Sequence, residues 1–333
     1  MTSGQRRLSA VAASAAFIAL VAACSGGGGN NEASASPGST GGGEQQAGQQ
    51  LSGDIKSDGS STVGPLTTAA SEFFAEEQPK VRVSVGTSGT GGGFEKFCNG
   101  ETDISNASRP IKDEEKAICD SKGVAFTELT VATDALTVVV NKENDWAKCL
   151  TTDQLKKIWE PAAQGKVKTW KDVDAKFPAE PLALAGPGTD SGTFDYFTDE
   201  INGEEGASRK DYSASENDND VVQAVSGAKG GLGYFGFTYF EENADKLNAV
   251  QVDSGKGCVT PSVETSQDGS YTPLARPLFV YVKNESAKRP EVKAFIDFYS
   301  ANIGKIATDA KYIPLNAEQE GKLKTAVQSL SGS

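Results

Sequence analysis

Three separated segments of this chain combine hydroxyl and glycine residues at positions where a helix could begin. They are Ser60-Ser61-Thr62, Thr87-Ser88-Gly89-Thr90-Gly91 and Asp190-Ser191-Gly192-Thr193. The first backbone N–H groups of a helix have no partner within that helix, and the helix dipole favours negative charge there. Glycine lets the backbone approach a ligand closely, and serine and threonine hydroxyls donate further hydrogen bonds. Together the three segments predict a site for a small tetrahedral oxyanion, and phosphate is the first expectation.

One cation and two carboxylates lie close to these segments in the sequence. Arg109, next to Ser108, carries a permanent charge, and its guanidinium can bind an oxyanion through two hydrogen bonds. Asp58 and Asp190 are candidates to accept the proton that phosphate keeps near neutral pH. Sulfate lacks that proton, so a buried carboxylate would select phosphate over sulfate. Either aspartate could instead cap its helix, and the sequence leaves both roles open.

Each segment taken alone has a plainer interpretation, because Gly, Ser and Thr also form turns and helix caps. The glycine segment matches neither G-x-x-x-x-G-K-[ST] nor G-x-G-x-x-G, the patterns of nucleotide-binding loops. Asn219 is a further candidate for the site, although the triplet Asp218-Asn219-Asp220 is typical of a helix cap. The occurrence of three such segments together with Arg109 is what favours a binding site.

The elements that must position these segments follow from the pattern of apolar residues. Valines alternate over residues 81–85 as in a half-buried strand, and Phe94 and Phe97 follow the glycine segment at helical spacing. Strands are also predicted over 135–140 and 277–282, and helices over 65–74, 151–159, 194–201 and 290–299. Because strands alternate with helices, we predict the α/β fold class.

The first 23 residues have the composition of a secretory signal peptide. Arg6 and Arg7 precede an apolar run over residues 8–23, and small residues lead directly to Cys24. A cysteine at that position is typical of a bacterial lipoprotein, in which it is lipidated and becomes the mature N-terminus. An ordinary signal peptide followed by a chance cysteine is the alternative. Residues 24–50 contain almost no large apolar side chain, so we predict a flexible tether.

We therefore expect an exported protein that its lipid anchors to the outer face of the bacterial cytoplasmic membrane. Four cysteines remain after Cys24, which in an exported protein indicates two disulfides with three possible connectivities. We favour Cys98–Cys119 with Cys149–Cys258, and the first of these would close a loop around Arg109. No pair has C-x-x-C spacing and the chain has no histidine, so we expect neither a metal nor a cofactor.

The overall composition excludes several classes of function. The formal charge is -13 and no basic cluster interrupts it, which argues against a nucleic-acid partner. The absence of histidine removes Ser-His-Asp and Cys-His catalysis and the usual general base. We therefore do not expect an enzyme. A length of 333 residues allows one large domain or two of medium size.

Four segments, in the order of one known family, give the chain a specific resemblance. They are DGSSTV (58–63), VSVGTSGTGGGFEKFCNGETDISNASRPI (83–111), GPGTDSGTFDYF (186–197) and GLGYFGFTYF (231–240). Together they resemble the substrate-binding lipoproteins of phosphate ABC transporters, the PstS type, from residue 51 to about residue 315.

The resemblance implies a type II periplasmic-binding-protein fold, with two α/β lobes, a two-strand hinge and a ligand cleft between the lobes. The binding domain would span residues 51–333, with lobe 1 at about 51–134 plus 283–333 and lobe 2 at about 135–282. Carried over position by position, the ligand-binding residues would be Ser61, Thr62, Ser88, Gly89, Thr90, Ser191, Gly192 and Thr193.

The chain departs from the best-known branch of that family at the cation. That branch has an aspartate at the position of Arg109 and an arginine at the position of Pro187. The cation is therefore expected to have moved from one loop to another, which leaves the identity of the acceptor carboxylate open.

The resulting hypothesis is a monomeric, non-enzymatic receptor that captures inorganic phosphate and delivers it to the permease of an ABC transporter. The same fold with sulfate or molybdate as ligand is the nearest alternative. A secreted phosphatase-like enzyme is less favoured, because the chain shows neither a metal cluster nor an activated nucleophile. A surface adhesin with a vestigial cleft is a third alternative.

Overall fold

The computed structural model describes residues 50–330. The predicted signal peptide (1–23), the proposed lipidation site Cys24 and the tether up to residue 49 lie outside the described residues. Within the described part, strands and helices alternate along most of the chain, as the α/β prediction required. None of the helices in that part is long and apolar enough to cross a membrane.

The first lobe is built on the order β2-β1-β3-β12-β4 within a nine-stranded sheet. Strands β1, β2 and β3 are parallel, and β12 runs antiparallel to both β3 and β4. These strands are β1 (Ser52–Gly59), β2 (Lys80–Val85), β3 (Ile104–Ala107), β4 (Phe126–Asn141) and β12 (Ala275–Lys283). The helices of this lobe are α1 (Gly64–Glu77), α2 (Gly89–Cys98), α3 (Asp113–Ser121), α10 (Pro290–Ala301), α11 (Ile303–Asp309) and α12 (Ala317–Leu330).

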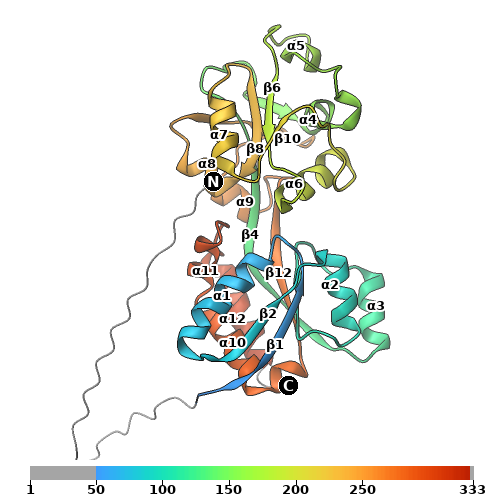
Figure 1. Cartoon of the computed structure of the whole chain (residues 1–333), viewed down its shortest axis with the longest axis vertical. Helices are drawn as coiled ribbons and strands as arrows, with labels where there is room; N and C mark the ends of the chain where they lie inside the picture. The colour runs from blue at the N-terminus through green and yellow to red at the C-terminus, as the bar shows by residue number, and fades with distance from the viewer. Residues whose placement is uncertain (1–49, 331–333) are drawn as a thin grey trace, which may run out of the picture. The chain divides into compact units, whose positions relative to one another are not determined.

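Two hydrophobic clusters cover the two faces of the first-lobe sheet. The larger cluster joins β1 and β4 to α1, α10, α11 and α12. The smaller one joins β12 to α2 and α3, which lie on the other side of the sheet (Figure 1). In the smaller cluster the ring of Phe94 packs edge-on against that of Tyr281, with 4.8 Å between centroids. This contact fixes α2, which begins inside the glycine segment, against β12.

The second lobe continues the same sheet through β8, β6 and β7, with β9 paired to β4, and adds a small sheet of β5, β10 and β11. Its strands are β5 (Cys149–Thr151), β6 (Ala183–Gly186), β7 (Ser213–Ala214), β8 (Gly231–Gly236), β9 (Leu247–Ala249), β10 (Gln251–Asp253) and β11 (Cys258–Val259). Its α-helices are α4 (Thr152–Trp159), α5 (Trp170–Val173), α6 (Gly192–Phe197), α7 (Asp218–Ser226), α8 (Phe237–Glu242) and α9 (Val263–Gln267). The Phe197 ring of α6 stacks on Tyr234 at 3.8 Å, and both rings contact Trp159.

Strands β4 and β12 connect the two lobes (Figure 1). β4 pairs with β12 as far as Ala135 and with β8 from Leu136 onward. The chain therefore enters the second lobe after residue 135 and returns at Ala275. The sequence analysis assigned residues 277–282 to the second lobe, whereas the structure pairs them with β3 and β4 of the first. The apolar pattern of a strand does not show which sheet it joins.

Both favoured disulfides are present. Cys98–Cys119 links α2 to α3 in the first lobe, and Cys149–Cys258 links β5 to β11 in the second. One predicted helix cap needs correction, and one that was left open is decided. The cap of α7 is Asn217, so the triplet 218–220 forms the first turn of the helix rather than its cap. The cap of α6 is Ser191, whose hydroxyl accepts from the Thr193 N–H, and not Asp190.

Candidate anion-binding cleft

A cavity of about 630 Å³ lies where the two lobes meet at the hinge strands, and each of the three predicted segments contributes to its wall. The predicted residues that line it are Ser60, Ser61, Thr62, Gly89, Thr90, Ser108, Arg109 and Gly192. Six other predicted residues lie outside its lining in the described conformation: Asp58, Ser88, Asp190, Ser191, Thr193 and Asn219. The structure thus brings together the three segments but not every residue within them.

The first segment forms a tight turn between β1 and α1. The Ser60 N–H donates to the Asn106 carbonyl at 2.9 Å, and the Thr62 N–H donates to the Ser60 hydroxyl at 3.2 Å. The hydroxyl of Tyr312 donates to the Thr62 carbonyl at 2.7 Å, which ties the turn to the C-terminal part of the lobe. These bonds hold the hydroxyl-bearing residues at the cavity wall with little freedom to move.

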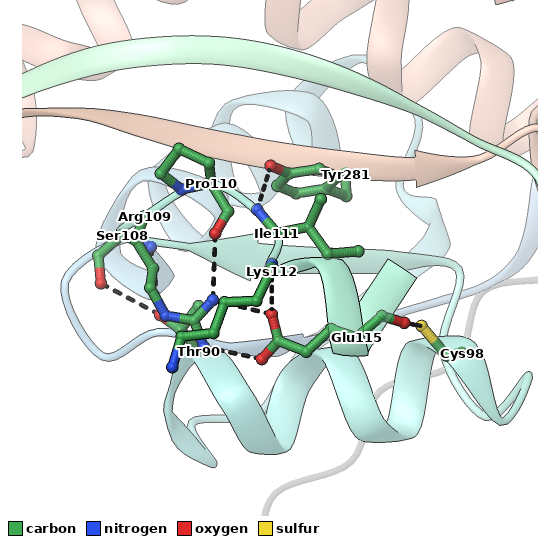
Figure 2. Close-up of polar contacts among 9 residues, drawn as sticks. All are labelled: Thr90, Cys98, Ser108, Arg109, Pro110, Ile111, Lys112, Glu115 and Tyr281. Carbon is green, nitrogen blue, oxygen red and sulfur yellow. Dashed lines mark hydrogen bonds and ion pairs between the residues drawn. The ribbon is translucent and has the colours of Figure 1, made fainter. Parts of the chain in front are cut away.

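The glycine segment reaches the same wall because α2 packs directly on β1. A Cβ atom on Gly93 would lie only 2.5 Å from the Gly59 Cα, so a side chain there would push the helix away. Beside the cavity, the Thr90 and Ser108 hydroxyls lie 3.1 Å apart, and the Ser108 N–H also donates to Thr90 (Figure 2). The hydroxyl of Thr90 therefore links the glycine segment to the loop that carries Arg109.

Asp58 holds the glycine segment from behind. Its carboxylate accepts from the Ser88 N–H at 3.0 Å and the Ser88 hydroxyl at 2.6 Å, and it pairs with the Lys96 ammonium at 2.6 Å. Burial acts to raise the pKa of Asp58, but the bonds from Lys96 and Ser88 outweigh it and hold that pKa below its usual value. With these partners the carboxylate is ionised at neutral pH and faces Ser88 and Lys96.

Arg109 lies on the first-lobe side of the cavity and already has an anionic partner. Its guanidinium donates to both Glu115 oxygens, at 2.8 and 2.7 Å, and also to the Pro110 carbonyl (Figure 2). The hydrogen bonds to Glu115 raise the pKa of Arg109, although burial opposes them. Glu115 in turn accepts from the Lys112 N–H at the start of α3. The predicted cation is therefore present in the cleft, as half of an ion pair.

Arg276 is a further cation of the cavity wall, beside Arg109 and the exposed Lys112, and the sequence analysis did not identify it. It lies on β12 directly across from Asp134 of β4, and its Nε is 3.3 Å from the Asp134 carboxylate. Its Nη2 donates to the Thr62 hydroxyl at 3.2 Å, and the guanidinium carbon lies 3.5 Å from the centroid of the Tyr196 ring. The feature of the sequence that could have identified Arg276 is its position immediately before the apolar run 277–282.

The second-lobe side of the cavity is acidic. Besides Gly192 and Tyr196 it presents the carboxylates of Asp195, Asp199, Glu200 and Glu205. Burial and the neighbouring Glu205 raise the pKa of Asp195, against the opposing effect of Arg276. Burial and Asp199 likewise raise the pKa of Glu200. A carboxylate that is partly desolvated next to others gains from a proton donor, so this side can receive an anion that carries a hydrogen.

The two sides of the cleft touch at Gly192. A Cβ atom there would lie 2.7 Å from the Thr62 hydroxyl and 3.3 Å from that of Ser61. Two other candidates, Asp190 and Asn219, do not line the cavity. Asp190 and Asn219 are exposed, and their N–H groups donate to Glu216 and Asn217. Among residues 50–330 no cluster of three or more Cys, Asp and Glu side chains could hold a metal ion.

Comparisons with known proteins agree with this architecture. A family model described as "PBP superfamily domain" matches residues 44–302. The protein SphX of Synechococcus elongatus is 49% identical over 79% of this chain and 78% of its own length. The phosphate-binding protein PstS of Staphylococcus saprophyticus is 44% identical over 81% of this chain and 84% of its own. The crystal structure of a possible phosphate-binding protein from Planctomyces limnophilus shares 44% identity and a TM-score of 0.80, and it covers 84% of this chain and 99% of its own.

Proposed function

Because this chain belongs to the PBP superfamily, and within it to the family of the PstS phosphate-binding proteins, we propose that it captures inorganic phosphate outside the cytoplasm for uptake by an ABC transporter. The observation that carries this proposal is the convergence of the three hydroxyl and glycine segments on one cavity between two lobes. The sequence predicts donors for a tetrahedral anion in each segment, although the segments are far apart in the chain.

The first lobe supplies most of the donors. The hydroxyls of Ser60, Ser61, Thr62 and Thr90 are neutral donors at the cavity wall. Ser88, Asp190, Ser191 and Thr193 lie within two residues of lining residues and remain proposed ligands that would need closure of the cleft to reach the anion, whereas Arg109 lines the cavity and is already paired with Glu115. Such a set of preformed donors replaces the hydration shell of the anion, and this replacement makes tight binding of a dehydrated ion possible.

Selection of phosphate over sulfate depends on where the phosphate proton goes. Asp58 and Asp190 were the expected acceptors, but Asp58 is paired with Lys96 and Asp190 is exposed. The carboxylate that lines the cavity closest to Gly192 in the sequence is Asp195. We include Asp195 in the proposal as the third candidate acceptor.

We propose further that Cys24 is lipidated, that the protein works as an anchored monomer on the outer face of the membrane, and that its second partner is the permease of the transporter. The signal-like residues 1–23 and the polar segment 24–50 support the anchor. Labelling of the expressed protein with a radioactive fatty acid tests it, and loss of label in the Cys24→Ala variant is the expected result.

Calorimetric titration tests the ligand. The purified protein is first unfolded and refolded to strip bound anion, then titrated with phosphate, sulfate and molybdate. We expect tight one-to-one binding of phosphate and little heat from sulfate. At phosphate near 1,000 times Kd, binding should stabilise the fold by roughly 4 kcal/mol, so the melting temperature should rise by several degrees. If only sulfate or only molybdate gives a binding signal, that anion and not phosphate is the ligand. If none of the three anions binds, the proposed function is refuted.

A further inference from the structure

Two arginines reach the cavity, and their surroundings differ in a way that decides which one holds the ligand. We propose that Arg276, on hinge strand β12, is the cation that binds the anion, and that its contacts with both lobes couple anion binding to closure of the cleft. This proposal rests on the proposed function and names the residue on which that function depends most.

Arg109 is poorly placed to be that cation because its charge is already matched. Its two terminal nitrogens are bound by the two oxygens of Glu115, and Nη1 also donates to Pro110 (Figure 2). Bidentate pairing of this kind is the strongest geometry that an arginine and a carboxylate can adopt. An incoming anion would have to displace Glu115 or bind beside it against its charge.

Arg276 has a looser ionic partner and unused donors. Its single ion pair, with Asp134, has an Nε–O distance of 3.3 Å, at the weak end for a charged hydrogen bond. The neutral hydroxyl of Thr62 accepts a hydrogen bond from Nη2. Among the described residues these contacts leave the Nη1 group for a ligand, and the side chain is only 18% exposed. A cation so shielded from water interacts more strongly with an anion than an exposed one does.

The position of Arg276 on the hinge gives the second half of the proposal. Thr62 belongs to the first lobe, Tyr196 to the second, and Asp134 to the neighbouring hinge strand. The guanidinium touches all three. The Tyr196 ring that lies against it is itself anchored, since its hydroxyl donates to the Pro273 carbonyl at 2.6 Å just before β12. Opening the cleft must therefore break the contact of Arg276 with either Thr62 or Tyr196. An anion bound to the guanidinium favours the closed cleft, in which Arg276 keeps both contacts.

Asp134 acts as a positioning residue in this arrangement. It does not line the cavity, and its side chain is 7% exposed. Burial raises the pKa of this carboxyl group and the Arg276 charge opposes that effect. Because Asp134 lies directly opposite Arg276 in the strand register, it fixes the direction in which the guanidinium leaves the hinge.

The test compares equivalent changes at the two arginines by phosphate calorimetry. Arg276→Lys keeps the charge opposite Asp134, so the fold should survive, but it loses the planar fork and the stacking on Tyr196. We expect phosphate affinity to fall at least ~100-fold in Arg276→Lys and less than ~10-fold in Arg109→Lys. Arg82→Lys is the matched control, because Arg82 is exposed on β2 and pairs with Asp54, away from the cleft; its affinity should equal that of the unaltered protein.

The outcomes separate this proposal from the proposed function. If the unaltered protein fails to bind phosphate, the function is wrong. If it binds, and Arg109→Lys loses as much affinity as Arg276→Lys or more, the function stands and the assignment of Arg276 is overturned. Small-angle scattering tests the coupling at saturating phosphate. We expect the unaltered protein to contract and Arg276→Lys to contract less, whereas full contraction of Arg276→Lys would overturn the coupling.

Discussion

The two sides of the cleft face one another with opposite chemistry. The first-lobe side presents the hydroxyls of the first and glycine segments, the paired Arg109 and the exposed Lys112. The second-lobe side presents one glycine, one tyrosine and four carboxylates. Both sides contribute to one cavity, yet only the first resembles an anion site when considered alone.

The difference suggests that the two lobes have different roles in binding. An anion that enters the cleft finds neutral donors on the first lobe and repulsion on the second, so the first lobe should bind it initially. The second lobe then closes on the bound anion and discriminates between anions with and without a proton. Gly192 lets it approach Thr62 closely, and its carboxylates oppose any anion that has no proton to donate. Arg276, at the hinge between the two sides, places a positive charge beside the acidic side.

The largest expected effect is the loss of stability when a disulfide is removed, and each lobe contains one disulfide. The second-lobe disulfide joins cysteines 109 residues apart, and the first-lobe disulfide joins cysteines 21 apart. Because a longer loop loses more entropy on closure, removal should cost roughly 5 kcal/mol for Cys149→Ser with Cys258→Ser and roughly 3 kcal/mol for Cys98→Ser with Cys119→Ser. Thermal unfolding of the two double variants checks the order, and a less stable first-lobe variant would contradict it.

The next effect concerns the contact between the two sides. Gly192→Val places carbon atoms where the Thr62 hydroxyl lies, so the second lobe cannot approach the first fully. We expect phosphate affinity to fall about 100-fold, equivalent to about 2.7 kcal/mol, in calorimetric titration. Gly304→Ala in α11 is the control, because a Cβ there meets no atom within 4 Å. A loss below threefold in Gly192→Val would mean that the bound state does not use this contact.

Selection by the second lobe can be tested at Asp195. Asp195→Asn removes a charge that repels sulfate, so sulfate affinity should rise about 10-fold while phosphate affinity falls or stays the same. In the unaltered protein, acid should act in the same direction, because the raised pKa of Asp195 means that the carboxylate takes up its proton as the pH falls through that value. Sulfate binding should therefore rise on acidification, and this rise should be smaller in Asp195→Asn. Asp190→Asn, at an exposed position, is the matched variant; a larger change there would restore Asp190 as the acceptor.

The sequence was sufficient for the parts of this molecule that depend on local pattern. Alternating valines predicted β2, and the pattern over residues 151–159 predicted α4. The even number of cysteines in an exported chain predicted two disulfides, and the favoured connectivity is the one present. The hydroxyl and glycine segments were also visible, because the residue types that bind an anion at a helix start are few. The strand, the helix and the hydroxyl and glycine segments share one property, which is that residues close together in the sequence determine them.

The residues that sequence reasoning missed are those whose role depends on distant partners. Arg276 is unremarkable beside Pro277, and only the β4–β12 register places it opposite Asp134 and close to Thr62. Arg109 is a candidate that the sequence did identify, but its ion pair with Glu115, six residues further on, forms only because α3 places that carboxylate beside it. The boundary at residue 282 was misplaced for the same reason, since strand pairing and not strand pattern assigns β12 to a lobe.

The smallest expected effect lies behind the first-lobe side, at Asp58. Its folded-state pKa is lower than its unfolded value of about 4, so the ionised carboxylate adds stability that is fully present above that value and is lost as the pH falls through the folded pKa. Asp58→Asn should therefore lower the free energy of unfolding by about 1 kcal/mol at pH 7, because it breaks the ion pair with Lys96 and weakens the bonds from Ser88. The difference from the unaltered protein should shrink as the pH falls below about 4, as followed by thermal unfolding.

Asp54→Asn provides the comparison, because its ion pair with Arg82 is exposed on both sides and should contribute almost nothing. Phosphate affinity in Asp58→Asn should fall less than fivefold, since the side chain supports the glycine segment without lining the cavity. A loss as large as that of Gly192→Val would instead place Asp58 in contact with the anion in the closed cleft. The first lobe would then carry a carboxylate of its own, and the division between a donating side and a selecting side would no longer hold.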